Sequence, residues 1–144
     1  MKRVLFAVLL LTIIGIAQSN ASSADFYHIV IVRFDNGIVN YVLGGPYNGK
    51  NWCEKNAQAV WDNVVTSCGQ CKREFQGCSE ASALPDPYKR TFRNEPIWLP
   101  YVVAMPKGRI LIAGVDKETA VRACQNAAAQ FRVNGYKQAV CIFK

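Results

Sequence analysis

Histidine is nearly absent from this chain, whose 144 residues include only His28. Catalytic triads, acid–base pairs and most zinc sites need several convergent groups, and a lone imidazole cannot supply them. The ten acidic residues are scattered singly, and Glu54, Asp116 and Asp35 are better explained as helix-capping and turn residues. The sequence therefore predicts a protein without enzyme activity, bound metal or cofactor.

Long apolar runs are also scarce. The main one, Val4 to Ala17, follows Lys2 and Arg3 and precedes a short polar stretch of small residues that ends at Ala24. This run is shorter than the ~20 apolar residues that a membrane span needs. The pattern is typical of a secretory signal peptide over residues 1–24, and no later segment predicts a transmembrane span.

Cysteine, in contrast, is plentiful, and all six cysteines follow the predicted signal peptide. An even number of cysteines in a small exported chain is typical of disulfide bonds. We therefore expect one disulfide-stabilised α+β domain over 25–144, in the bacterial periplasm or outside the cell. Loss of residues 1–24 removes two cations and lowers the net charge from +7 to +5. This basic excess favours acidic partners.

The apolar pattern predicts two similar halves, each with two strands and an amphipathic helix, and a final strand at the end. The helices share a short string, Cys53-Glu54-Lys55-Asn56-Ala57 in one and Cys124-Gln125-Asn126-Ala127 in the other. The order ββα-ββα-β predicts an antiparallel-leaning sheet of about five strands with two helices on one face, a relative of the ferredoxin-like fold. The expected strands are 26–34, 38–43, 97–105, 109–113 and 138–143, and the expected helices are 52–66 and 117–133.

Short motifs predict how these elements begin and end. Asn36-Gly37 predicts a type I′ turn in the first hairpin. Asn51 with Glu54 predicts an N-cap and capping box for the first helix, and Asp116 predicts the cap of the second. Pro100, within the third expected strand, predicts an edge position or a bulge.

The expected elements indicate part of the disulfide pairing. Cys124 lies on the core face of the second helix and Cys141 on the strand that returns beneath it, so we expect these two to pair. Cys53 is expected to pair with one of three cysteines in the segment that follows the first helix. The remaining two would then pair together, with Cys71–Cys78 as the first choice.

The segment Cys68-Gly69-Gln70-Cys71-Lys72 resembles the signature of thioredoxins, and Leu99-Pro100-Tyr101 resembles the proline-bearing strand of that family. The resemblance implies a thiol–disulfide oxidoreductase. In that alternative Cys68 is the attacking thiolate, Cys71 is the resolving thiol, and Pro100 is a cis-proline that faces them.

Two further alternatives concern the envelope and zinc. The second half resembles SPOR domains in its element order, with an Ala-rich helix followed by Gly135-Tyr136 and a last strand, and this resemblance implies a cell-envelope glycan-binding module. Zinc binding would need four thiolates, which an oxidising compartment disfavours. The cysteines available for it are Cys53, Cys68, Cys71 and Cys78.

A long connection, 67–96, shows no helical or strand periodicity, and from Tyr88 to Tyr101 cations alternate with aromatic residues. Aromatic and arginine side chains are common anchors of protein interfaces. We therefore predict a small, basic, non-catalytic binding protein that contacts another exported protein as an inhibitor or immunity-type partner would. Nucleic acid is not expected as a partner of an exported chain. The predicted binding residues are Tyr88, Lys89, Arg90, Phe92, Arg93 and Trp98.

Overall fold

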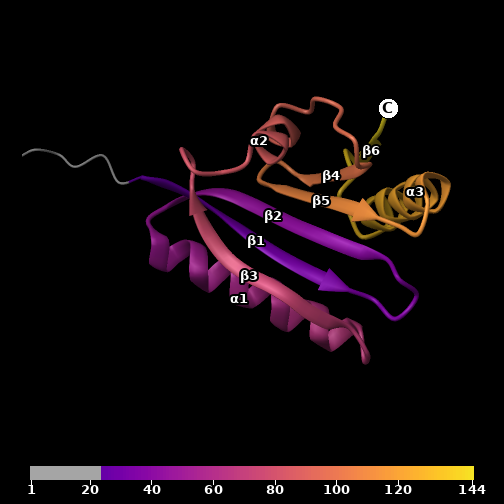
Figure 1. Cartoon of the computed structure of the whole chain (residues 1–144), viewed down its shortest axis with the longest axis horizontal. Helices are drawn as coiled ribbons and strands as arrows, with labels where there is room; N and C mark the ends of the chain where they lie inside the picture. The colour runs from indigo at the N-terminus through magenta and orange to yellow at the C-terminus, as the bar shows by residue number, and fades with distance from the viewer. Residues whose placement is uncertain (1–23) are drawn as a thin grey trace, which may run out of the picture.

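The computed structural model describes residues 24–144, so the predicted signal peptide lies, apart from Ala24, outside the described residues. The described chain is an α+β fold with one antiparallel six-stranded sheet and three helices (Figure 1). In chain order the elements are β1 (Asp25–Arg33), β2 (Val39–Asn48), α1 (Lys50–Ser67), β3 (Lys72–Glu80), α2 (Asp86–Phe92), β4 (Tyr101–Met105), β5 (Gly108–Ala113), α3 (Lys117–Val133) and β6 (Val140–Ile142).

The sheet order β3-β1-β2-β5-β4-β6 divides the sheet into two units with the same connectivity. In the first unit β1 and β2 form a hairpin, α1 follows, and β3 pairs with the outer side of β1. In the second unit β4 and β5 form the hairpin, α3 follows, and β6 pairs with the outer side of β4. The two units join where β2 pairs with β5. The fold is therefore an internal ββαβ repeat about the β2–β5 pair.

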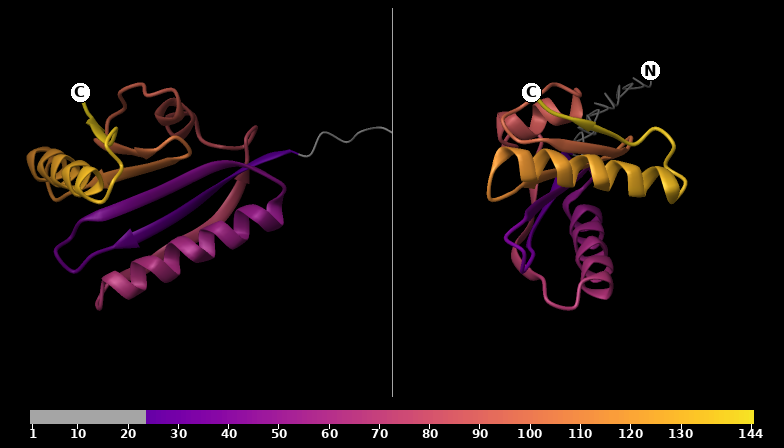
Figure 2. Two further views of the ribbon diagram at one scale, coloured as in Figure 1. Left: turned by 180° about the vertical axis from the view of Figure 1, so that it is seen from behind. Right: turned by 90° about the vertical axis from the view of Figure 1, so that its right-hand side faces the viewer.

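Both long helices cover the same face of this sheet. Val42 lies opposite Val30 on β1 and Ile110 on β5, and Val102 on β4 lies opposite Ile110 and Cys141. Paired residues share a face of a sheet, and α1 packs near Val30 whereas α3 packs near Val102. The two helices run in different directions (Figure 2), as the twist of the sheet between the units requires.

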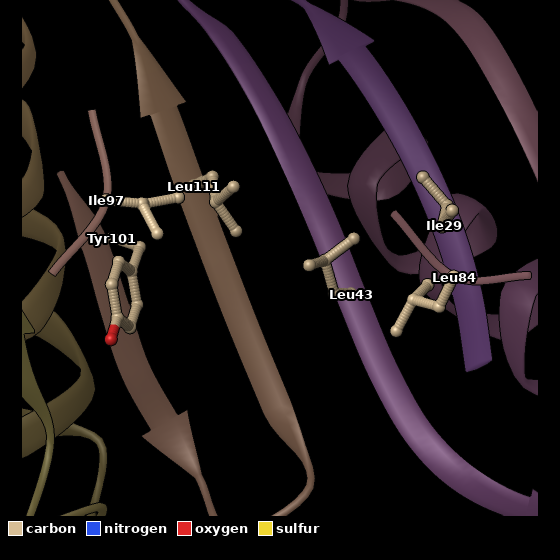
Figure 3. Close-up of a cluster of buried hydrophobic side chains, with 6 residues drawn as sticks. All are labelled: Ile29, Leu43, Leu84, Ile97, Tyr101 and Leu111. Carbon is tan, nitrogen blue, oxygen red and sulfur yellow. The ribbon is translucent and has the colours of Figure 1, made fainter. Parts of the chain in front are cut away.

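The opposite face of the sheet packs against the connection between β3 and β4, which includes α2. Tyr101 is fully buried there, and its hydroxyl donates a hydrogen bond to the carbonyl oxygen of Glu95 at 2.9 Å. This cluster joins strands of both units to the connection (Figure 3), and its buried members are Ile29, Leu43, Leu84, Ile97, Tyr101 and Leu111.

The expected count of about five strands and two helices is wrong, because the segment 67–96 is not an irregular connection. It contains β3, where the residues from Lys72 to Phe75 are exposed along the sheet edge, so no apolar alternation marks the strand. It also contains α2, whose seven residues are too few to show a helical period. The ferredoxin-like relation is wrong as well, because the last strand pairs with β4 and not beside β1.

The local motifs are confirmed in part. Asp116 caps α3 by accepting a hydrogen bond from the backbone N–H of Thr119 at 2.7 Å. The first hairpin forms, but its turn is not type I′, because at Asn36-Gly37 only the glycine has a positive φ, 83°. Asn51 does not cap α1, which begins one residue earlier at Lys50. Pro100 precedes β4, so this strand keeps partners on both sides.

The disulfides repeat between the two units. Cys53–Cys78 joins α1 to β3, and Cys124–Cys141 joins α3 to β6 as expected, with Cα atoms 6.1 Å and 5.6 Å apart. The third bond, Cys68–Cys71, lies at the end of α1. The expected Cys71–Cys78 bond is wrong. Cys71 directly precedes β3 and Cys78 lies on it, so seven residues of strand, about 20 Å, separate the two.

Every cysteine of the described chain is in one of these three bonds. Such pairing is consistent with an oxidising, exported environment. Between residues 24 and 144, none of the helices is both long enough and apolar enough to cross a bilayer.

Candidate functional site

Two of the three aromatic residues predicted to bind a partner, Tyr88 and Phe92, face the sheet. The Phe92 ring lies 4.9 Å from the ring of Tyr27, and the Tyr88 ring lies 6.5 Å from that of Tyr41. The guanidinium carbon of Arg109 also lies over the Phe92 ring, 5.3 Å from the ring centroid. Both aromatic residues are partly buried against the core, and they hold α2 on the sheet.

The cations of the same segment are engaged within the segment. Arg90 and Arg93 both donate to the Glu95 carboxylate, at 3.0 Å and 2.6 Å. These hydrogen bonds, the one from Arg93 first, hold the pKa of Glu95 below its ordinary value. Lys89 donates to the carbonyl oxygen of Ser82 at 3.3 Å. The contacts close the chain around the end of α2, and of the predicted binding residues they leave Trp98, 64% exposed, as the most open aromatic side chain.

An open groove lies at the free end of the second unit, beside the β4–β5 turn. We name it the β4–β6 groove, and its volume is about 840 Å³, within the range of small-molecule and peptide-side-chain sites. Met105, Tyr136 and Val140 line it and are each between 44% and 47% exposed. None of the residues that line it is acidic; they are Asn94, Val103, Ala104, Met105, Pro106, Arg109, Gly135, Tyr136, Lys137, Gln138, Val140 and Ile142.

The wall of the groove that follows α3 is held by local contacts. Gly135, with a φ of 99°, reverses the chain after the helix. The backbone N–H of Tyr136 then donates to the carbonyl oxygen of Phe131 at 2.9 Å, and the two rings lie 5.8 Å apart. Arg132 donates to the carbonyl oxygen of Ala139 at 2.7 Å. These contacts place Tyr136 beside the groove before β6 begins.

Arg109 supplies the buried polar group of the groove. It is 3% exposed, and its Nη1 atom donates to three carbonyl oxygens of the β4–β5 turn at 2.8 to 3.4 Å. Nε donates to the carbonyl oxygen of Thr91 at 2.8 Å, and Nη2 donates to Oδ1 of Asn94 at 3.0 Å. Burial lowers the pKa of Arg109 from its ordinary value. The side chain thus ties α2 to the turn, and no carboxylate of the described chain pairs with it.

His28 lies in the core, on the face that α1 covers. Its side chain is 3% exposed, and neither ring nitrogen has a hydrogen-bond partner among the described residues. The ring stacks on Tyr47 at 5.6 Å, and a Cβ added at Gly44 would lie 2.4 Å from its Cε1 atom, so only glycine fits there. Burial lowers the pKa of His28 to about 4. The arrangement is that of a packed neutral imidazole without an acid–base partner.

Cys68 and Cys71 are bonded to each other, and Cys68 is the C-cap residue of α1. A thiolate at a helix C-terminus is disfavoured by the helix dipole, whereas redox enzymes place the attacking thiolate at a helix N-terminus. Pro100 precedes β4, and three strands separate β4 from β3 in the sheet. The proline that the thioredoxin resemblance places beside the two sulfurs therefore lies elsewhere. The zinc alternative is wrong, because all four proposed ligands are in disulfides.

The groove residues come from three separate segments, so no single local motif predicts the groove. Two of them, Gly135 and Tyr136, belong to the pattern that resembles SPOR domains, and Arg109 is a cation followed directly by the apolar run Ile110 to Ala113 of the same strand. A charged residue at the start of a buried strand needs partners, but the sequence does not say which. No known protein family, no curated protein and no solved structure matches this chain.

Proposed function

We propose that this chain is a small exported binding protein, in the bacterial periplasm or outside the cell, and that its partner is another exported protein. The observation that supports this proposal is the exposed apolar rim of the β4–β6 groove, formed by Met105, Tyr136 and Val140. Contiguous exposed apolar side chains are typical of interaction sites. Aromatic residues and methionine are enriched at protein interfaces.

The rim is carried by a rigid base. Cys124–Cys141 bonds β6 to α3, and the segment between them is fixed by the hydrogen bonds of Tyr136 and Arg132. Fewer degrees of freedom are lost on binding when a surface is ordered beforehand. A rigid, disulfide-bonded surface without a catalytic group fits an inhibitor or immunity-type partner of another exported protein.

The charge of the groove favours an acidic occupant. Its lining includes Arg109 and Lys137 but no acidic residue. The partner is therefore a protein segment that carries apolar side chains together with negative charge, because such a segment complements both the rim and the cations.

Replacement of a rim residue tests this proposal. Val140→Glu places a negative charge in the apolar rim, where it also repels an acidic partner, and is expected to weaken partner binding about tenfold or more, as loss of an interface anchor does. Val115→Glu is the matched control, because Val115 is an exposed valine at the opposite end of β5. Binding of the oxidised protein to the exported proteins of its own cells is measured by interferometry on fractionated samples. Equal binding by the two variants would contradict the proposal.

A thiol–disulfide oxidoreductase is the second candidate, favoured by the bonded pair Cys68–Cys71 with exposed Gly69 and Gln70 between them. The position at the end of α1 argues against it. Reduction of insulin by a dithiol separates the two candidates: a catalytic rate that disappears in a Cys68→Ser variant would support the oxidoreductase. The binding protein predicts no rate above the uncatalysed one.

A further inference from the structure

Arg109 has one more donor than the chain uses. A guanidinium carries five N–H groups, one on Nε and two on each terminal nitrogen. Nε and both N–H groups of Nη1 donate to backbone carbonyl oxygens, and Nη2 donates once, to Oδ1 of Asn94. The second N–H group of Nη2 has no acceptor within residues 24–144. Arg109 and Asn94 both line the β4–β6 groove, so the hydrogen bond from Nη2 to Oδ1 joins two residues of its lining.

Arg109 is also a buried cation without an anion. All its acceptors are neutral, namely carbonyl oxygens and one amide oxygen. Glu95, the acidic residue that follows Asn94 in the sequence, is already paired with Arg90 and Arg93. A buried charge without a counter-ion is costly, and an arginine paired with a carboxylate forms hydrogen bonds about twice as strong as neutral ones.

We propose that the β4–β6 groove binds a carboxylate group of its partner and that Nη2 of Arg109 is the donor that holds it. This inference rests on the proposed function, since it names the chemical group recognised at the same site. The apolar rim of Met105, Tyr136 and Val140 contacts the side chains on either side of that carboxylate. The group therefore belongs to an apolar peptide segment, either as its C-terminal carboxylate or as an aspartate or glutamate side chain.

The shape of the sheet favours an extended segment. β6 pairs with β4 only from Tyr101 to Val103, although β4 continues to Met105. Within the described chain, nothing pairs with the outer side of these last two residues as a strand. An extended peptide can occupy such a position by adding to a sheet edge, and its alternate side chains then meet the rim.

The probes are short acetylated peptides that differ only in charge. Acetyl-Leu-Ala-Leu with a free carboxylate is compared with its C-terminal amide, and amidated acetyl-Leu-Glu-Leu is compared with amidated acetyl-Leu-Gln-Leu. Each is titrated into ¹⁵N-labelled oxidised protein at neutral pH. The free acid, the glutamate peptide or both are expected to shift the amide resonances of Met105, Tyr136 and Val140 and the guanidinium resonance of Arg109. The uncharged peptides are expected to bind about 10- to 100-fold more weakly.

Asn94→Asp is the decisive variant, because it offers Nη2 a carboxylate from within the chain. The substitution keeps the size of the side chain, and aspartate tolerates the positive φ of 59° at this position. It is expected to raise the midpoint of thermal unfolding while reducing the affinity for the charged peptides by at least about tenfold. Asn126→Asp, on the exposed part of α3, is the control for net charge and is expected to leave both quantities unchanged.

Three results would overturn the carboxylate assignment: no shift with any charged peptide, equal shifts with charged and uncharged peptides, or undiminished binding by Asn94→Asp. Its failure is distinguishable from failure of the proposed function. If uncharged peptides bind at the rim and Val140→Glu still weakens partner binding, the groove is a binding surface without an Arg109 anchor. If Val140→Glu and Val115→Glu bind the partner equally, the groove itself is not the interface.

Discussion

Single residues in this protein show how burial decides what a polar side chain can do. His28 and Arg109 are equally buried, at 3% exposed, but their surroundings differ. The carbonyl and amide oxygens of two segments, Thr91 to Asn94 and the β4–β5 turn, accept hydrogen bonds from Arg109, and it remains charged. His28 is given no hydrogen-bond partner in the described chain, and it is neutral. Arg109 can therefore bind an anion, whereas His28 contributes only by packing.

The neutral state of His28 makes the protein sensitive to acid. Its pKa is about 4 when folded and about 6.5 when unfolded, so between these values the unfolded chain binds more protons. Stability from this residue is complete above pH 6.5 and is lost as the pH falls towards 4, by about 3 kcal/mol in all. We expect the free energy of unfolding in urea to fall over this range.

The contribution of His28 is isolated by a variant. His28→Phe keeps an aromatic ring against Tyr47 and removes the titrating group, so its unfolding free energy is expected to vary less between pH 7 and pH 4. Hydrogen bonds lower the pKa values of Glu95 and Asp116, so the stability that these carboxylates contribute is lost in both proteins as the pH falls. A parallel pH dependence in parent and variant would show that His28 does not titrate as described.

At the scale of elements, the disulfides act as links between a helix and a strand. The two long links, Cys53–Cys78 and Cys124–Cys141, join residues that are 25 and 17 positions apart in sequence, whereas the partners of Cys68–Cys71 are 3 positions apart. Because closing a longer loop removes more entropy from the unfolded chain, removal of either long link is expected to cost about 3 kcal/mol and removal of the short one about 2 kcal/mol.

Paired cysteine-to-serine variants measure this difference by urea unfolding at neutral pH. The variant without Cys124–Cys141 is also expected to lose ordered amide signals of β6, because three strand residues alone hold this strand to β4. An equal cost for all three bonds would contradict the loop-length account.

The elements that the sequence predicted are those whose signals are local. Asp116 begins α3 because its side chain reaches a backbone N–H three residues later, and the hairpin at Asn36-Gly37 forms because glycine accepts a positive φ. β3 was missed because its side chains from Lys72 to Phe75 face solvent, so burial imposes no alternation on them. The groove was missed because Asn94, Arg109 and Tyr136 meet only after the sheet has formed.

At the scale of the whole molecule, the internal repeat explains where the groove lies. In the first unit β3 pairs with β1 from Phe26 to Arg33 and so covers nearly its full length. In the second unit β6 pairs with only three residues of β4. The hairpin end of β4 therefore lacks the strand that Lys72 and its neighbours supply at the equivalent place in the first unit. We propose that a segment of the partner takes the place of this absent strand.

Site-specific photo-crosslinking in the producing cells tests this central claim most directly. A photoreactive amino acid is placed at Val140 in the groove rim, and separately at Trp98 on the connection and at Val115 beyond β5, which are all exposed positions. The predicted result is a covalent adduct with one exported protein from Val140 alone, with an acidic, apolar segment of that protein in the crosslink. Adducts from Trp98 or Val115 without one from Val140 would contradict the account.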